Sequence, residues 1–162
     1  MRAELRLARR TVPQAASLED GLQLLGRALE TEPGGSAGPL RLEVPLVEPA
    51  PALALPAGFP DGALEPLVLA GRDWSGAGLA WECEVETPAR LPSPREATGE
   101  DLRLAVSVRF DPSRDVGPEW AAFGRCRLWL PALEYDAAGR RLAVNLNAGD
   151  EAQRQRLCAA IG

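Results

Sequence analysis

Residues 127–146 read RLWLPALEYDAAGRRLAVNL, and this stretch decides what kind of fold to expect. Apolar and polar residues alternate on both sides of YDAAGR, which predicts two antiparallel strands joined by a turn. Gly139 suits the positive φ that ends such a turn. Pro131 lies inside the first strand, and the parity of the apolar side chains shifts between Leu128 and Leu133. A bulge beside the proline accounts for the shift, because a bulge tolerates a residue that cannot donate to the ladder.

The N-terminal half contributes a helix and a strand. SLEDGLQLLGRALE predicts a helix that Ser17 caps, with Asp20 as its capping-box partner. The apolar face of this helix consists of Leu18, Leu22, Leu25 and Leu29. Residues 40–47 alternate, with Leu40, Leu42, Val44 and Leu46 on one face and Arg41, Glu43 and Pro45 on the other. Pro45 indicates an edge strand or the end of the strand.

The middle of the chain alternates between loops and short strands. The proline-dense residues 48–66 predict a surface loop with one short helical turn. A short strand at 67–70, a turn at 71–78 and a strand at 79–85 follow. A further strand is expected to direct inward Leu102, Leu104, Val106, Val108 and Phe110. A short helix beginning at Pro118 and a final helix capped by Asp150 complete the prediction.

Together these elements predict an α+β fold. The sheet is expected to be antiparallel, with meander and hairpin connections, and helices from both ends of the chain pack on one of its faces. The 162 residues suit one domain, or one large piece of a bigger one. No apolar run approaches the roughly 18 residues needed to span a bilayer, and the basic N-terminus lacks the apolar segment of a secretory signal.

Composition excludes several classes of chemistry. The sequence contains neither histidine nor lysine, so it offers no Ser/His/Asp or Cys/His arrangement and no lysine Schiff base. The three cysteines, Cys83, Cys126 and Cys158, lack C-x-x-C spacing and are interpreted as buried or half-buried residues of a cytoplasmic protein. The net charge of -5 argues against nucleic acid as a partner. We predict no catalytic, cofactor or metal residue in the chain.

Three groups of residues are weak candidates for a functional site, and we favour a structural interpretation of each. The acidic row on the 79–85 strand and beyond (Glu82, Glu84 and Glu86) is typical of a solvated strand face. Asp111 and Asp115 could form a carboxylate pair, but FDPSRD is more typical of a turn. The tryptophans, which could line a pocket, are interpreted as core residues; they are Trp74, Trp81, Trp120 and Trp129.

The second half of the chain resembles the N-terminal region of isochorismate synthases. RFDPS, EWAAFGRCRLWLPALEY, a glycine and LAVNL follow one another as in that family of chorismate-utilising enzymes. The matching positions are Phe110, Asp111 and Pro112; Trp120 and Phe123; Leu130, Pro131, Leu133 and Glu134; and Gly139. Upstream, GRDWSGAGLAWECEV is similar to the family's Arg-Asp turn and the strand after it. Two positions depart from the pattern: Ala132 replaces an arginine and Ala80 replaces a glycine.

The resemblance implies that residues 1–162 form a single N-terminal domain of isochorismate-synthase type. The parent activity would be the Mg²⁺-dependent conversion of chorismate to isochorismate, for menaquinone or siderophore biosynthesis. The family's catalytic residues belong to a chorismate-binding domain that is absent from this chain, and its lysine base has no counterpart here. That catalytic domain, on the same or a separate chain, is the expected partner, and self-association of the present chain is the other possibility.

Three hypotheses therefore remain. The chain is the N-terminal part of an isochorismate synthase, or a stand-alone binding or regulatory domain that kept the scaffold without the chemistry, or an unrelated α+β interaction domain. The reading frame downstream of codon 162 separates the first two.

Overall fold

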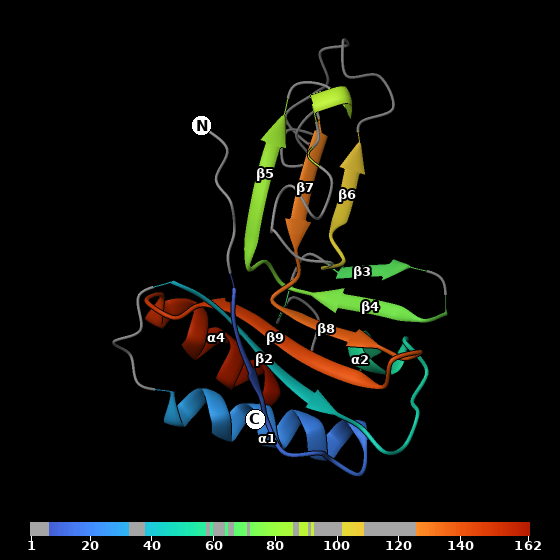
Figure 1. Cartoon of the computed structure of the whole chain (residues 1–162), viewed down its shortest axis with the longest axis vertical. Helices are drawn as coiled ribbons and strands as arrows, with labels where there is room; N and C mark the ends of the chain where they lie inside the picture. Colours follow the sequence, from blue (N-terminus) through green and yellow to red (C-terminus); the bar gives the residue numbers. More distant parts are fainter. Residues whose placement is uncertain are drawn as a thin grey trace. The chain divides into compact units, whose positions relative to one another are not determined.

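The computed structural model of this chain describes residues 7–32, 38–57, 59, 64, 67–70, 72–85, 88–90, 92, 102–108 and 126–162. The chain divides into two compact units (Figure 1). The larger unit comprises Leu7–Ala80 and Pro131–Gly162, and the smaller comprises Met1–Arg6 and Trp81–Leu130. The larger unit is therefore built from two separate stretches of sequence.

The larger unit contains a six-stranded sheet in the order β1-β2-β9-β8-β4-β3. Its strands are β1 (Ala8–Thr11), β2 (Pro39–Pro45), β3 (Leu67–Ala70), β4 (Trp74–Ala77), β8 (Leu133–Asp136) and β9 (Arg141–Asn147). Every neighbouring pair is antiparallel except β1 with β2. The predicted α+β class and the mainly antiparallel sheet are thus confirmed.

Two helices from opposite ends of the chain, α1 (Leu18–Thr31) and α4 (Glu151–Ile161), contact each other and the sheet on one face (Figure 1). A short helix, α2 (Ala54–Ala57), contacts β4 and supplies the helical turn expected in the proline-dense segment. That segment is less superficial than predicted, because Ala52 and Leu55 are buried. The two outer helices therefore supply the apolar cover that the alternating strands require.

The predicted capping box begins α1. The Ser17 hydroxyl oxygen accepts the Asp20 N–H at 3.2 Å, and the Asp20 carboxylate accepts the Ser17 N–H at 3.2 Å. Leu25 and Leu29 on the predicted apolar face are buried. At the other end of the chain, the Asp150 carboxylate accepts the Gln153 N–H at 2.9 Å, so the predicted cap of α4 is also confirmed.

Substituting Ser17→Ala is expected to lower the free energy of unfolding by about 1 kcal/mol, because an N-terminal N–H of α1 loses its acceptor. Urea denaturation followed by circular dichroism measures the loss. Ser17→Asn is the matched control, since asparagine retains a capping oxygen, and it should remain near the wild type. Equal stabilities of the alanine and asparagine variants would show that this cap contributes nothing.

Strand β2 has the alternation of buried apolar residues that was predicted for it. Leu40, Leu42, Val44 and Leu46 are all buried against the helices, as expected. Pro45 is the last residue of β2, where a missing N–H interrupts no later part of the ladder. The alternative that Pro45 marks an edge strand is wrong, because β2 lies between β1 and β9.

Two strands of this sheet were not predicted. The exposed residues of β1 show no apolar alternation, yet they pair with β2 in parallel. Residues 74–77, expected as part of a turn, form β4 and pair with both β3 and β8. Glycine and alanine in β4 weaken its strand signal, and pairing on both sides overrides local preference.

The hairpin at 127–146 divides at Pro131. Strand β7 (Cys126–Leu130) pairs with β5 and β6, whereas β8 pairs with β9 and β4. The irregularity expected next to Pro131 is confirmed, and Leu128 and Leu133 are both buried, at 1% and 0% exposure. It is a complete break rather than a bulge, because the chain passes there from one sheet to another. The expectation that β7 pairs within the hairpin is wrong.

Arg140 holds the left-handed conformation in the β8–β9 turn, with φ of 50°, and the prediction that Gly139 does so is wrong. Gly139 instead lies against the side chain of Asp136. A Cβ atom added there would lie 2.5 Å from Asp136 Oδ2, while the Gly139 N–H donates to Asp136 Oδ1 at 3.1 Å. The Asp136 carboxylate thus folds back over Gly139, and a larger residue at this position would require that side chain to move.

The smaller unit contains a three-stranded sheet in the order β5-β7-β6. Among the described residues, its elements are β5 (Trp81–Val85), a 3₁₀ turn (Pro88–Arg90), β6 (Ala105–Val108) and β7. Glu82 and Glu84 of β5 are exposed while the alternating apolar residues are half-buried, as predicted. The inward placement of Val106 and Val108 is wrong: they are 54% and 47% exposed, whereas Ala105 of the same strand is buried.

Several expectations lie outside the described residues. They concern Phe110, Asp111, Pro112, Asp115, Trp120 and Phe123, and the short helix expected to begin at Pro118. The cysteines follow the prediction, with Cys126 buried and Cys83 and Cys158 half-buried. Within the described ranges, no helix is both long and apolar enough to cross a membrane.

Candidate functional site

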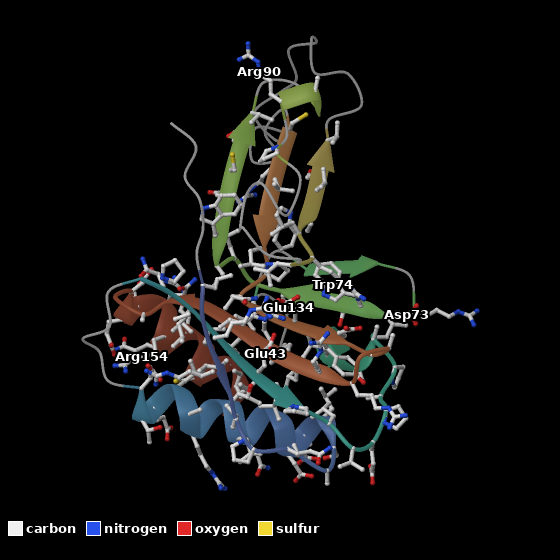
Figure 2. The ribbon with its side chains drawn as sticks, in the orientation of Figure 1. Glu43, Asp73, Trp74, Arg90, Glu134 and Arg154 are labelled. Atoms are coloured by element: carbon white, nitrogen blue, oxygen red, sulfur yellow. The ribbon has the colours of Figure 1, made fainter. Side chains whose placement is uncertain are left out.

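The strongest cluster of polar side chains lies on the face of the six-stranded sheet opposite α1 and α4. Alternation along each strand sends the apolar residues to the helices and leaves Arg41 on β2, Asn145 on β9, Glu134 on β8 and Trp74 on β4 for the other face. In Figure 2, Trp74, Glu134 and Glu43 lie along the sheet, whereas Arg154 lies on α4. The four residues Arg41, Asn145, Glu134 and Trp74 are buried, with Asn145 at 0%, Glu134 at 4% and Arg41 at 9% exposure.

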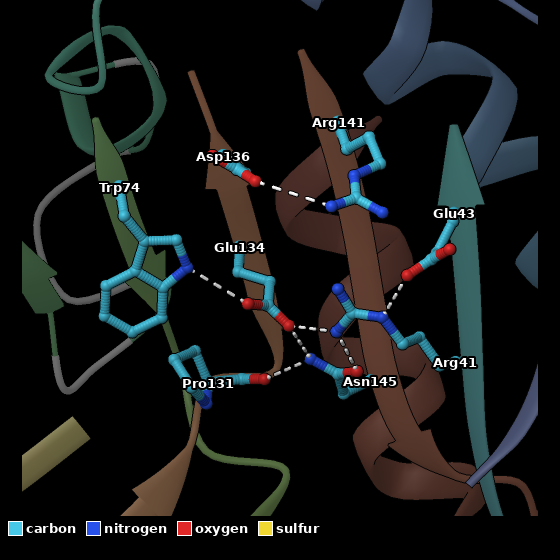
Figure 3. Close-up of polar contacts among 8 residues, drawn as sticks. All are labelled: Arg41, Glu43, Trp74, Pro131, Glu134, Asp136, Arg141 and Asn145. Carbon is cyan, nitrogen blue, oxygen red and sulfur yellow. Dashed lines mark hydrogen bonds and ion pairs between the residues drawn. The ribbon is translucent and has the colours of Figure 1, made fainter. Parts of the chain in front are cut away.

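Glu134 is the centre of this cluster (Figure 3). Its Oε1 accepts hydrogen bonds from the Arg41 guanidinium and from Asn145 Nδ2, the latter at 2.7 Å. Its Oε2 accepts the Trp74 indole N–H at 3.1 Å. A buried carboxylate is stable only when charge and hydrogen bonds compensate for its lost hydration. Here one cation and two neutral donors, drawn from three other strands, provide that compensation.

The register of the sheet explains how these side chains reach one another. Glu134 is paired with Ala143 on β9 and with Gly76 on β4, so both of its lateral neighbours are small. Arg41, from β2, is long enough to extend past β9 to the carboxylate, and the Trp74 indole approaches from β4 (Figure 3). The small residues at 143 and 76 therefore make room for an interaction that spans four strands.

Arg41 also binds Glu43 and Asn145. Its Nε donates to the Glu43 carboxylate, and its Nη1 donates to Asn145 Oδ1 at 2.8 Å. Burial opposes the charge of Arg41, but the charges and hydrogen bonds of Glu134 and Glu43 outweigh burial and raise the pKa of Arg41 above its ordinary value. Arg41 is therefore a fixed positive charge at any ordinary pH.

Glu43 has the opposite shift. Burial opposes its ionisation, but the hydrogen bond and charge of Arg41, with the charges of Arg9 and Arg141, outweigh burial and lower the pKa of Glu43 below its ordinary 4.5. A carboxyl group whose pKa is lower in the folded state contributes stability above its unfolded pKa and loses it as the pH falls through the folded pKa.

Wild-type stability should therefore fall as the pH drops below about 4.5, more steeply than in the variant Glu43→Gln, which cannot titrate at this position. Each extra proton bound on unfolding changes the slope by at most about 1.4 kcal/mol per pH unit. Urea unfolding from pH 7 to pH 3 measures both slopes. Parallel curves for the two proteins would contradict the assigned direction of the shift.

Asn145 connects the cluster to the break in the hairpin. Its side-chain Nδ2 donates to the Pro131 carbonyl oxygen at 2.9 Å, and its backbone N–H donates to the Ala132 carbonyl oxygen at 2.7 Å. The Ala132 N–H in turn donates to the Gly78 carbonyl oxygen at 3.2 Å. Gly78 has φ of 68°, a conformation that favours glycine. The cluster thus holds the two residues at which the chain leaves one sheet for the other.

The chemical character of the cluster follows from these bonds. Both oxygens of Glu134 are occupied by donors of the protein itself, and its neighbours are an arginine, an amide and an indole. Among the described residues, the buried side-chain atoms without a hydrogen-bond partner are Glu32 Oε1 and Ser75 Oγ, and neither belongs to this cluster. No group of three potential metal ligands occurs within the described residues. The arrangement is suited to fixing the sheet.

The sequence analysis also considered an acidic row, a carboxylate pair and the tryptophans as possible functional residues. Glu82 forms an ion pair with Arg127 across β5 and β7, so the acidic row is partly neutralised within its own sheet. Trp74 and Trp129 are buried and Trp81 is half-buried, which agrees with core positions. Trp120, Glu86, Asp111 and Asp115 lie outside the described residues.

The polar cluster itself was not predicted. Arg41 was assigned to the outer face of its strand, and Glu134 was noted as part of the Leu-Pro-x-Leu-Glu segment, but 93 positions separate them. The sequence pattern that could have indicated the cluster was weak. Arginine and glutamate alternate with leucines on β2, and a glutamate occurs among buried residues of β8, where a buried acid requires a partner.

Comparison with known proteins gives no assignment: no protein-family model matches the chain, and no curated protein matches it.

Proposed function

We propose that this chain supplies the non-catalytic N-terminal scaffold of an isochorismate synthase, which converts chorismate to isochorismate with Mg²⁺ in menaquinone or siderophore biosynthesis. The observation that supports the proposal is the behaviour of the Leu-Pro-x-Leu-Glu segment on which the resemblance rests. Pro131 ends one ladder, Leu133 enters the core, and Glu134 becomes the centre of the buried polar cluster. Each of these three motif residues therefore has a structural role in the fold.

In this proposal the partner is a cytoplasmic chorismate-binding domain, encoded on the same or a separate chain. That domain holds the Mg²⁺ and the residues that activate water. The present chain contributes neither, because it has no lysine and no histidine, and because the acids of its polar cluster are bound to arginine, asparagine and tryptophan. Its role is to support the partner's fold through its sheets.

The purified chain, incubated with chorismate and Mg²⁺, should form no isochorismate above the uncatalysed background. A chromatographic assay that separates the two isomers measures this, with an active isochorismate synthase as positive control. Product formed in proportion to the concentration of this chain, in a preparation free of other synthases, would refute the assignment of a non-catalytic scaffold.

A second experiment tests whether this chain binds a chorismate-binding domain. If the gene downstream encodes a chorismate-binding domain, co-expression with residues 1–162 should yield a complex that survives gel filtration and has isochorismate synthase activity. Leu133→Ala in the present chain should weaken the complex, whereas Leu53→Ala, on an exposed side chain, should not.

The alternative function is a stand-alone binding or regulatory domain that retains the scaffold. The observation that favours it is that the fold leaves the acids and donors of its polar cluster engaged with each other. A monomeric chain in light scattering, with no affinity for any chorismate-binding domain of the same genome, would favour this alternative.

A further inference from the structure

We draw no further inference here: the strongest candidate, the apolar face of the three-stranded sheet on which Val106 and Val108 of edge strand β6 are exposed, carries nothing because nothing in the described part of the structure shows what covers it.

Discussion

Replacing Glu134 with alanine is expected to lower the free energy of unfolding of the larger unit by about 3–5 kcal/mol, the usual result of removing one partner of a buried ion pair. Arg41, a residue at 9% exposure, would keep only Glu43 as a charged partner. The Trp74 indole N–H would lose its acceptor, and Asn145 Nδ2 would keep only the Pro131 carbonyl oxygen. Chemical denaturation followed by far-ultraviolet circular dichroism measures the change.

Two further variants test whether the loss of stability in Glu134→Ala comes from breaking the buried ion pair. Glu151→Ala removes a glutamate that pairs with Arg154 on the surface of the same unit, and it should cost less than about 1 kcal/mol. The double variant Arg41→Met with Glu134→Leu replaces the buried pair by apolar side chains, and it should be more stable than Glu134→Ala alone. If Glu134→Ala cost no more than Glu151→Ala, the buried cluster would not be a principal determinant of stability.

Replacing Leu133 with alanine is expected to cost about 2–5 kcal/mol, because a fully buried leucine leaves a cavity in a packed core. This residue is the first of β8, directly after the break at Pro131, and it packs on the helix side of the sheet. The measurement is again the midpoint and slope of urea unfolding.

Leu53→Ala is the matched control, since the same substitution on a side chain that is 62% exposed should change stability by less than about 0.5 kcal/mol. Similar costs for the two variants would mean that Leu133 does not enter the core, and that the shift in parity across Pro131 has been misassigned.

The elements that were predicted correctly depend on residues that lie only a few positions apart in the sequence. The capping box of α1 needs only Ser17 and Asp20, three positions apart, and β2 is visible because its leucines alternate with charged residues. The shift in parity at Pro131 likewise indicated an irregularity, although it could not distinguish a bulge from a change of sheet. Both outcomes leave the same alternation on either side of the proline.

The features that were missed depend on distant partners. β1 is a strand because β2 offers a free edge, and residues 74–77 form β4 because β8 lies next to them in space. The polar cluster joins Arg41 to Glu134, and no spacing rule connects positions so far apart. Val106 and Val108 have the alternation of a buried face, but alternation alone does not tell which of the two faces of a strand is covered, and here the buried residue is Ala105.

The pairing of β2 with β9 in the centre of the sheet has a consequence for synthesis on the ribosome. Arg41 and Asn145, which face each other in this ladder, are 104 positions apart. At about 5–20 residues per second, roughly 5–20 s pass between their translation. During that interval the nascent chain carries the leucines of α1 and β2 without the strand that completes their core. We expect this interval to be when the growing polypeptide most needs a chaperone.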